Sequence, residues 1–367
     1  MDRPADTSDI LNSLARLRQG SHAGREETRR LVDGVLAGTV DLELFGQWLL
    51  ALADLGESAD EIAGVAEALR GRMLPVHTTY AVVADTCGTG GDGCGSFNIS
   101  TAAAIVAAAA GLPVAKHGNR AVTSRTGSAD VLEQLGVAVG VPPETSSRQL
   151  ETIGICFCLA PVHHPAMARV GPLRRSLGRP TVFNLVGPLC NPAGASVQVI
   201  GVGRAAAREP LAEAARLLGA KRTLVVSGHL GDVTHGDTHG DKHGVTHEKV
   251  FDEISLFGPT DVIDVSAGTI ERSRWTPEDF GVATQPLERL EELSVAGPAE
   301  SAAAIRDVLA GVTGPRRDVV LLNAAAVLWA AGTASDLTAA RATAEAAIDS
   351  GAAARLLLKM VPGTKTG

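Results

Sequence analysis

The feature that most constrains this chain is a glycine-rich loop between a short apolar run and an alanine-rich segment. Residues 88–95 contain five glycines, and the polar sequence SFNIST follows directly. The apolar run 81–84 predicts a strand before the loop, and the alanine-rich segment predicts a helix from about Thr101 to Gly111. A strand, a glycine loop and a helix in this order are typical of an α/β sheet that binds an anion at the helix N-terminus.

The loop has the chemistry of a phosphate site. Glycine has no Cβ atom, so its backbone N–H groups can wrap closely around an anion. The first turn of the next helix adds unpaired N–H groups and the positive end of the helix dipole. The side chains of Ser96, Asn98 and Ser100 add further donors. We therefore predict that this segment holds a phosphate or a pyrophosphate.

Two better-known nucleotide loops fit this stretch less well. The spacing of Gly88, Gly90 and Gly93 matches the dinucleotide-binding fingerprint, which also needs an acidic residue about 20 positions later. That region instead contains Pro113 and Lys116, which disfavours a nicotinamide enzyme. A P-loop would end in Gly-Lys-Ser or Gly-Lys-Thr, and this loop does not.

Outside the loop, the sequence predicts helices at the beginning of the chain and alternating strands and helices in the remainder. Periodic apolar residues predict helices over 25–35 and 42–55, and Ser58 with Glu61 forms a capping-box pattern that opens another helix. Beyond His77 the apolar patterns predict helices at 205–218 and 299–309, and strands at 114–116, 197–202, 223–226 and 319–322. We expect an α/β fold, with a small N-terminal helical domain and a large domain whose central sheet is flanked by helices.

Composition excludes several other classes of protein. The chain has 367 residues, 45% of them apolar, which suits a large hydrophobic core and not a disordered chain. A net charge of -8 without a long basic run argues against nucleic acid as the main partner. Five cysteines without a CxxC pair suit free thiols in a reducing compartment. No apolar run reaches the roughly 20 residues of a membrane span, and the first residues lack a signal-peptide pattern, so we expect a cytoplasmic protein without a membrane partner.

Three polar motifs lie beyond the loop. The sequence KHGNR (116–120) follows a predicted strand, and its cations and amide suit a phosphorylated sugar. The Pro- and His-rich stretch 161–167 precedes Arg174, whose guanidinium can pair with the carboxylate of an aromatic acid. Asp252 and Glu253 are adjacent carboxylates, of the kind that share Mg²⁺ with substrate phosphates.

A histidine repeat stands apart from these motifs. Histidines recur every four residues from His235 to His247, a spacing that would align them on a helix and suggest a metal site. Each repeat also contains a glycine, which opposes a helix. We interpret the repeat as a surface loop.

Together these motifs resemble the anthranilate phosphoribosyltransferase family, from about Arg25 to the end of the chain. The matching stretches occur in the order found in the family, and GTGGD, KHGNR and HHPAM are specific as a set. The stretches are GTGGDG with SFNIST (88–101), AKHGNR (115–120), SRTGSADVLEQLG (124–136), APVHHPAM (160–167), LRRSLG (173–178), FNLVGPLCNPA (183–193) and DEISLFGPT (252–260). The segment between Val226 and Asp252 is longer than the family pattern leads us to expect.

The resemblance implies a site built from these stretches. The positions that match ligands of phosphoribosyl pyrophosphate are Gly88, Gly91, Asp92, Ser96, Asn98, Ile99, Ser100, Thr101, Lys116 and Ser128. The positions that match contacts to anthranilate are Gly88, Asn119 and Arg174. The positions that match the magnesium site are Ser100, Asp252 and Glu253. No side chain is assigned as a catalytic acid or base.

The resemblance also implies an activity and an organisation. The activity is transfer of the phosphoribosyl group to anthranilate in tryptophan biosynthesis, with Mg²⁺ as cofactor, by a homodimer. The helical domain would span 1–76, joined by a helical segment near 165–190, and the catalytic α/β domain would span 77–164 and 191–367. The alternatives are a pyrimidine nucleoside phosphorylase-like enzyme, a phosphoribosyltransferase with another acceptor, and a non-catalytic regulator that kept the fold.

Overall fold

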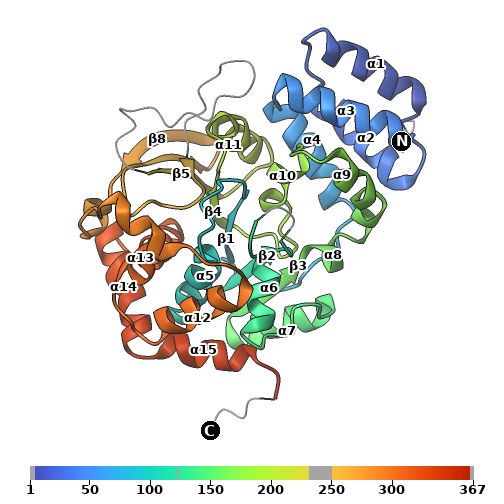
Figure 1. Ribbon diagram of the computed structural model, residues 1–367. Helices are drawn as coiled ribbons and strands as arrows, with labels where there is room; N and C mark the ends of the chain where they lie inside the picture. Colours follow the sequence, from blue (N-terminus) through green and yellow to red (C-terminus); the bar gives the residue numbers. More distant parts are fainter. Residues whose placement is uncertain (1–4, 122–123, 231–249, 364–367) are drawn as a thin grey trace.

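The computed structural model describes residues 5–121, 124–230 and 250–363, so the histidine repeat lies outside the described residues. A helical bundle is followed by a large α/β domain whose mixed sheet is flanked by helices (Figure 1). The bundle contains α1 (Thr7–Arg18), α2 (Arg25–Ala37), α3 (Leu42–Leu55) and α4 (Ala59–Arg70). The helices predicted at 25–35 and 42–55 are therefore confirmed as α2 and α3.

Local sequence explains where the bundle helices begin. The carboxylate of Asp41 accepts the N–H of Leu44 (2.9 Å) at the start of α3. At α4, the predicted capping box of Ser58 and Glu61 is confirmed, since each side chain accepts the backbone N–H of the other residue. These caps satisfy N–H groups that the first helical turn leaves without intrahelical partners.

The sheet has eight strands, and its first half is parallel. The order is β3-β2-β1-β4-β5-β7-β8, with β6 also paired to β5. The pairs among β1 to β5 are parallel, whereas β6 and β7 run antiparallel to β5, and β8 runs antiparallel to β7. The strands are β1 (Ala84–Gly88), β2 (Val114–Gly118), β3 (Ile155–Leu159), β4 (Val197–Gly201), β5 (Arg222–His229), β6 (Val250–Phe251), β7 (Thr260–Ser266) and β8 (Thr269–Trp275).

Two strand predictions need correction. Residues 319–322 form part of a helix, α13 (Pro315–Ala330), and the strand prediction there was wrong. The run is apolar because α13 is buried on almost all sides, and a short apolar run does not distinguish such a helix from a buried strand. The strand predicted at 81–84 begins only at Ala84 and extends to Gly88, because its parallel partners β2 and β4 begin opposite Ala84.

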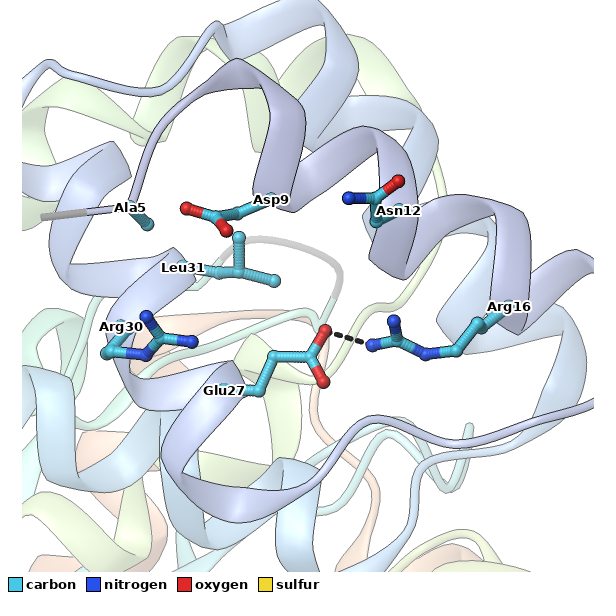
Figure 2. A pocket seen from close by; sticks show the side chains of 7 residues that line it. All are labelled: Ala5, Asp9, Asn12, Arg16, Glu27, Arg30 and Leu31. Atoms are coloured by element: carbon cyan, nitrogen blue, oxygen red, sulfur yellow. Dashed lines mark hydrogen bonds and ion pairs between the residues drawn. The ribbon is translucent and has the colours of Figure 1, made fainter. Parts of the chain in front are cut away.

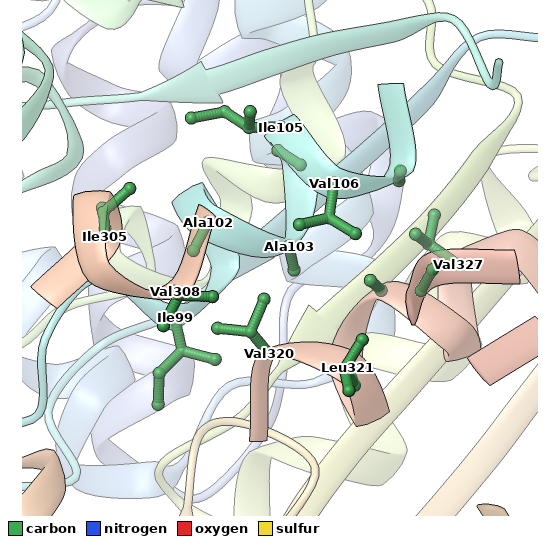
Figure 3. Packing of buried hydrophobic residues seen from close by; sticks show 14 of the residues in the cluster. Ile99, Ala102, Ala103, Ile105, Val106, Ile305, Val308, Val320, Leu321 and Val327 are labelled. Carbon is green, nitrogen blue, oxygen red and sulfur yellow. The ribbon is translucent and has the colours of Figure 1, made fainter. Parts of the chain in front are cut away.

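Alternate residues of the central strands face two different cores. Val199, Leu224 and Val226 belong to the larger core, whereas Ile200 and Val225 belong to the core that includes the helical bundle. This is the period of two expected for strands buried on both faces. In the larger core, α5 (Ile99–Ala109) packs against α12 (Pro298–Leu309) and α13, as the side chains in Figure 3 show.

The remaining helices pack on the sheet, on other helices, or between the sheet and the bundle. On the sheet lie α7 (Pro143–Ile153) and α11 (Arg208–Leu217), whereas α6 (Ser128–Gln134), α14 (Leu337–Asp349) and α15 (Ala352–Met360) pack on α12, α13 or α5. Short helices α8 (Ala160–His163), α9 (Gly171–Leu177) and α10 (Phe183–Val186) lie between β3 and β4 in the chain. Short 3₁₀ turns occupy 165–169, 188–190, 205–207, 277–280 and 287–293. Within the described ranges, no helix has both the length and the apolar character to cross a lipid bilayer.

Candidate phosphate and metal site

The glycine-rich loop leaves the carboxyl end of β1 and is tied to the neighbouring strand. Gly88 pairs with Gly201 at the end of β4, and the N–H of Thr89 donates to the carbonyl of Gly201 (2.8 Å). Beyond this point Gly90 and Gly91 have φ angles of +72° and +89°. Residues other than glycine rarely adopt this backbone conformation. The loop therefore needs glycine for its shape as well as for access to its N–H groups.

The loop ends at the N-terminus of α5, where a lysine and a carboxylate meet the first helical turn. The N–H of Ser100 donates to Glu253 Oε1 (3.1 Å). Lys116 lies in the middle of β2, and its Nζ donates to the carbonyl of Thr86 (2.6 Å) and lies 3.4 Å from Ser100 Oγ. The Lys116 cation thus lies close to a helix N-terminus whose backbone N–H groups have no intrahelical partners. Both features favour the binding of a polyanion.

Asp252 packs directly against the loop. Its Oδ2 atom accepts the N–H of Gly90 (2.9 Å). A Cβ atom on Gly88 would lie 2.5 Å from that oxygen, and a Cβ on Gly201 would lie 1.6 Å from the Asp252 carbonyl oxygen. Glycine is therefore required at both strand ends so that the acidic segment can approach the phosphate loop.

The carboxylates of this region repel one another in partly buried surroundings. Burial, together with the charges of Asp92 and Glu253, raises the pKa of Asp252 well above its usual range. Burial also raises the pKa of Glu253 to about 8, although Lys116 opposes that shift. Such shifts mean that the ionised carboxylates lack compensating positive charge in the protein alone.

A divalent cation would supply that charge, and the residues present fit one. The Oδ2 atom of Asp92 is buried and has no hydrogen-bond partner among the described residues. Within the same residues no cluster of three or more acidic, histidine or cysteine side chains forms a metal cage. Mg²⁺ usually binds through one or two carboxylates plus substrate phosphates, so a half-built site beside a phosphate loop suits this ion.

A buried polar network lies beside Lys116. Asp85 Oδ2 accepts from Asn191 Nδ2 (2.8 Å), and Asp85 Oδ1 accepts the N–H of His117 (3.2 Å). Burial raises the pKa of Asp85 to about 6, while the charge of Lys116 acts in the opposite direction. Asp85 and Asn191 were not among the predicted site residues, although Asp85 lies in β1 just before the loop and Asn191 lies in the stretch FNLVGPLCNPA.

The residues expected to contact a sugar phosphate or an aromatic acid lie on other elements. Ser128 begins α6 and packs against Gly118, where an added Cβ would lie 2.1 Å from its Oγ atom. Its hydroxyl donates to the carbonyl of Asn119 (3.3 Å), the residue that follows β2. Arg174 lies on α9, and among the described residues no hydrogen bond or ion pair joins it to the phosphate loop.

A separate cavity of about 220 Å³ lies in the helical bundle, lined by residues of α1 and α2 (Figure 2). Arg16 and Glu27 form an ion pair across it. It contains none of the residues predicted for the site, and we assign it no role in the activity.

Comparison with known proteins agrees with this geometry. Residues 12–73 match the helical bundle domain of a glycosyl transferase family, and residues 80–243 and 237–354 match its α/β domain. The anthranilate phosphoribosyltransferase of Rhodopirellula baltica is 44% identical over 353 residues, which cover 96% of this chain and 97% of that protein. The chain belongs to the anthranilate phosphoribosyltransferase family. The resemblance drawn from the sequence motifs is confirmed.

Solved structures of anthranilate phosphoribosyltransferases share the fold. The crystal structure of the Thermus thermophilus enzyme matches with a TM-score of 0.82 and 41% identity, covering 95% of this chain and 98% of that one. The Saccharomyces cerevisiae enzyme was solved in complex with PRPP (phosphoribosyl pyrophosphate) and Mg. It matches with a TM-score of 0.81 and 27% identity, covering 96% of this chain and 97% of that one.

Proposed function

We propose that the protein transfers the phosphoribosyl group of 5-phosphoribosyl 1-pyrophosphate (PRPP) to the amine of anthranilate. The products are N-(5-phosphoribosyl)anthranilate and pyrophosphate, and the reaction belongs to tryptophan biosynthesis. The main observation in support is that the glycine loop and the N-terminus of α5 contact the carboxylates of Asp252 and Glu253. Membership of the family supports the same function.

The chain acts mainly by binding and alignment. In our proposal the N–H groups of the loop and of Ser100 and Thr101 bind the diphosphate, while Lys116 and Ser128 bind the phosphorylated sugar. As the bond from C1 to the diphosphate oxygen breaks, the leaving group gains charge that these donors stabilise. The neutral aryl amine forms the new C1–N bond and then loses a proton to solvent. No acid, base or nucleophile of the protein is needed, so we assign none.

Mg²⁺ is the proposed cofactor, and Ser100, Asp252 and Glu253 would hold it. When bound, this ion would neutralise diphosphate charge in the leaving group. The raised pKa values of both carboxyl groups, which burial causes, support the proposal, because a bound cation would favour their ionised forms. The yeast family member, whose structure was solved in complex with PRPP and Mg, also supports this assignment.

Arg174 and Asn119 are proposed to bind anthranilate. The Arg174 guanidinium lies 5.1 Å from the centre of the Phe183 ring, and burial lowers the pKa of Arg174. No carboxylate of the described chain pairs with it, so it is available for the carboxylate of an aromatic acid.

The proposed organisation has a helical domain of residues 1–76, joined by the segment near 165–190, and an α/β domain of 77–164 and 191–367. In support, Leu173 and Leu177 of α9 pack against Gly46 of α3. We propose a homodimer because the family resemblance implies one, and because exposed Leu11 on α1 and partly exposed Leu50 on α3 leave apolar surface for a partner. A cytoplasmic location is proposed from the five free cysteines and from the phosphorylated substrates.

The loss of anthranilate fluorescence on mixing with PRPP tests the function. We expect rapid loss with Mg²⁺ and pyrophosphate release in equal amount. Uracil as acceptor, or a nucleoside with phosphate, should give no product. Turnover of a pyrimidine nucleoside instead would favour the phosphorylase alternative, and binding of PRPP without turnover of any acceptor would favour the regulator.

A further inference from the structure

The C-terminal part of the glycine loop, residues 95–97, forms backbone hydrogen bonds with residues 293–295, which lie far away in the sequence. The N–H of Phe97 donates to the carbonyl of Leu293 (2.9 Å), and the N–H of Val295 donates to the carbonyl of Gly95 (3.0 Å). These bonds form an isolated antiparallel bridge between Ser96 and Ser294. The loop that is proposed to bind diphosphate is therefore braced by residues some 200 positions later, just before α12.

The first turn of α12 continues this contact through a buried serine. Ser301 is fully buried, and its Oγ atom lies 2.8 Å from Asn98 Oδ1 and 3.0 Å from the backbone nitrogen of Asn98. The hydroxyl thus donates to the side-chain oxygen and accepts the N–H of the same residue. A second hydroxyl, Oγ1 of Thr126, donates to Asn98 Oδ1 at 2.9 Å.

Two hydroxyl donors determine which way the Asn98 amide faces. An amide oxygen accepts about two hydrogen bonds, and here both come from Ser301 and Thr126. The amide nitrogen keeps only a long contact of 3.5 Å to the carbonyl of Thr126. Asn98 is partly exposed at the start of α5, so its NH₂ group remains available to an anion in the loop.

We infer that Ser301 is a positioning residue for the phosphoribosyl donor, acting by fixing Asn98 with its NH₂ group toward the diphosphate. The inference rests on the proposed function for the identity of the donor. It extends the site to α12, which none of the sequence motifs includes. Without the Ser301 hydroxyl, the Asn98 amide could turn and present its oxygen to a phosphate, which repels it.

Steady-state kinetics of Ser301→Ala test the inference. We expect the KM for PRPP to rise about tenfold, as for the loss of one hydrogen bond at a charged ligand, with the KM for anthranilate changed less than about twofold. Thr126→Val should act in the same direction, and Thr126→Ser should restore the wild-type KM. Ser13→Ala is the matched control, because Ser13 is also fully buried and bonds one side chain, Trp48, within the helical bundle.

A double-mutant cycle separates positioning from general destabilisation. If Ser301 acts through Asn98, Ser301→Ala should have no further effect on the KM for PRPP in an Asn98→Ala background. Additive effects, or equal rises in the two KM values, would overturn the inference. Should Ser301→Ala not fold, the same cycle with Thr126→Val decides. Calorimetric titration with PRPP and Mg²⁺ gives the same comparison even for a protein without transferase activity, so failure of the proposed function remains distinguishable.

Discussion

In the proposed function, Arg174 is the residue that selects the acceptor. Its guanidinium is partly buried beside Phe183 without a carboxylate partner in the described chain, and burial lowers its pKa. A buried cation without an anion is costly, and an aromatic acid would supply both a carboxylate and a ring.

We predict that Arg174→Ala raises the KM for anthranilate about 10- to 100-fold, the range for one charged hydrogen-bonded pair. The KM for PRPP should change less than about threefold. The neighbouring Arg175 is exposed and provides the control, since Arg175→Ala should leave both values unchanged. Equal rises in the two KM values for Arg174→Ala would contradict a carboxylate contact.

Glu253 shows that a site residue can oppose stability. Its pKa rises from an ordinary 4.5 to about 8, mainly through burial, so the folded protein holds a proton that the unfolded chain releases in this range. The contribution of Glu253 to the stability of the metal-free protein therefore falls as pH rises from about 4.5 to about 8.

We predict that Glu253→Gln raises the Tm of the metal-free protein at pH 8.5 by about 2 °C or more, with little change near pH 4.5. The glutamine still accepts the N–H of Ser100, but Mg²⁺-dependent turnover should be lost. Thermal unfolding at the two pH values and a magnesium titration measure both effects. A variant that is less stable at pH 8.5, or that responds to Mg²⁺ as the wild type does, would refute this account.

At the scale of elements, the ends of β1 and β4 bring the acidic segment to the loop. Gly201 leaves space that the backbone of Asp252 fills.

We predict that Gly201→Ala lowers kcat by about 100-fold and weakens the response to Mg²⁺, because a shift of about 1 Å in Asp252 would misalign the proposed metal ligands. Gly140 has open space around its Cα, so Gly140→Ala is the control. Wild-type kinetics in Gly201→Ala would mean that this contact does not position the metal ligands.

Features set by neighbouring residues were mostly predictable from the sequence, whereas the helix at 319–322 and the role of Ser301 depend on distant contacts and were not. The loop, the capping box at Ser58 and the helices α2 and α3 depend on spacing within a few residues, and all were predicted. The strand expected at 319–322 failed because α13 is surrounded by apolar neighbours, which no local pattern reveals. The contact between Ser301 and Asn98 joins residues 203 positions apart, and only the folded chain brings them together.

At the scale of the whole molecule, buried histidines lie where the sheet meets the 183–193 segment that packs on the helical bundle. The ring of His117 donates to the carbonyl of Gly187 (3.0 Å), and that of His164 donates to the carbonyl of Cys190 (3.0 Å). Burial lowers the pKa of His117 to about 3 and that of His164 to about 4. Both rings are thus neutral at pH 7, and both must gain a proton when the chain unfolds in mild acid.

We predict that these two histidines contribute a loss of stability as pH falls from about 6.5 to about 4, because the unfolded chain then binds more protons at them. Asp85 and Glu253, with their raised pKa values, act in the opposite direction within that range. Comparison with His164→Gln isolates the histidine effect, since Asp85 and Glu253 are common to both proteins. As pH falls over this range, the Tm of the wild type should decline relative to that of the variant, whereas parallel curves would contradict the prediction.

The central claim is that bare backbone at the tip of α5, beside Asp252 and Glu253, binds a diphosphate and releases it. A crystal structure with PRPP and Mg²⁺ tests this most directly. We predict that the diphosphate lies against residues 88–101, with the ion between it and the two carboxylates. Well-defined diphosphate bound elsewhere on the protein, with this loop empty, would contradict the account.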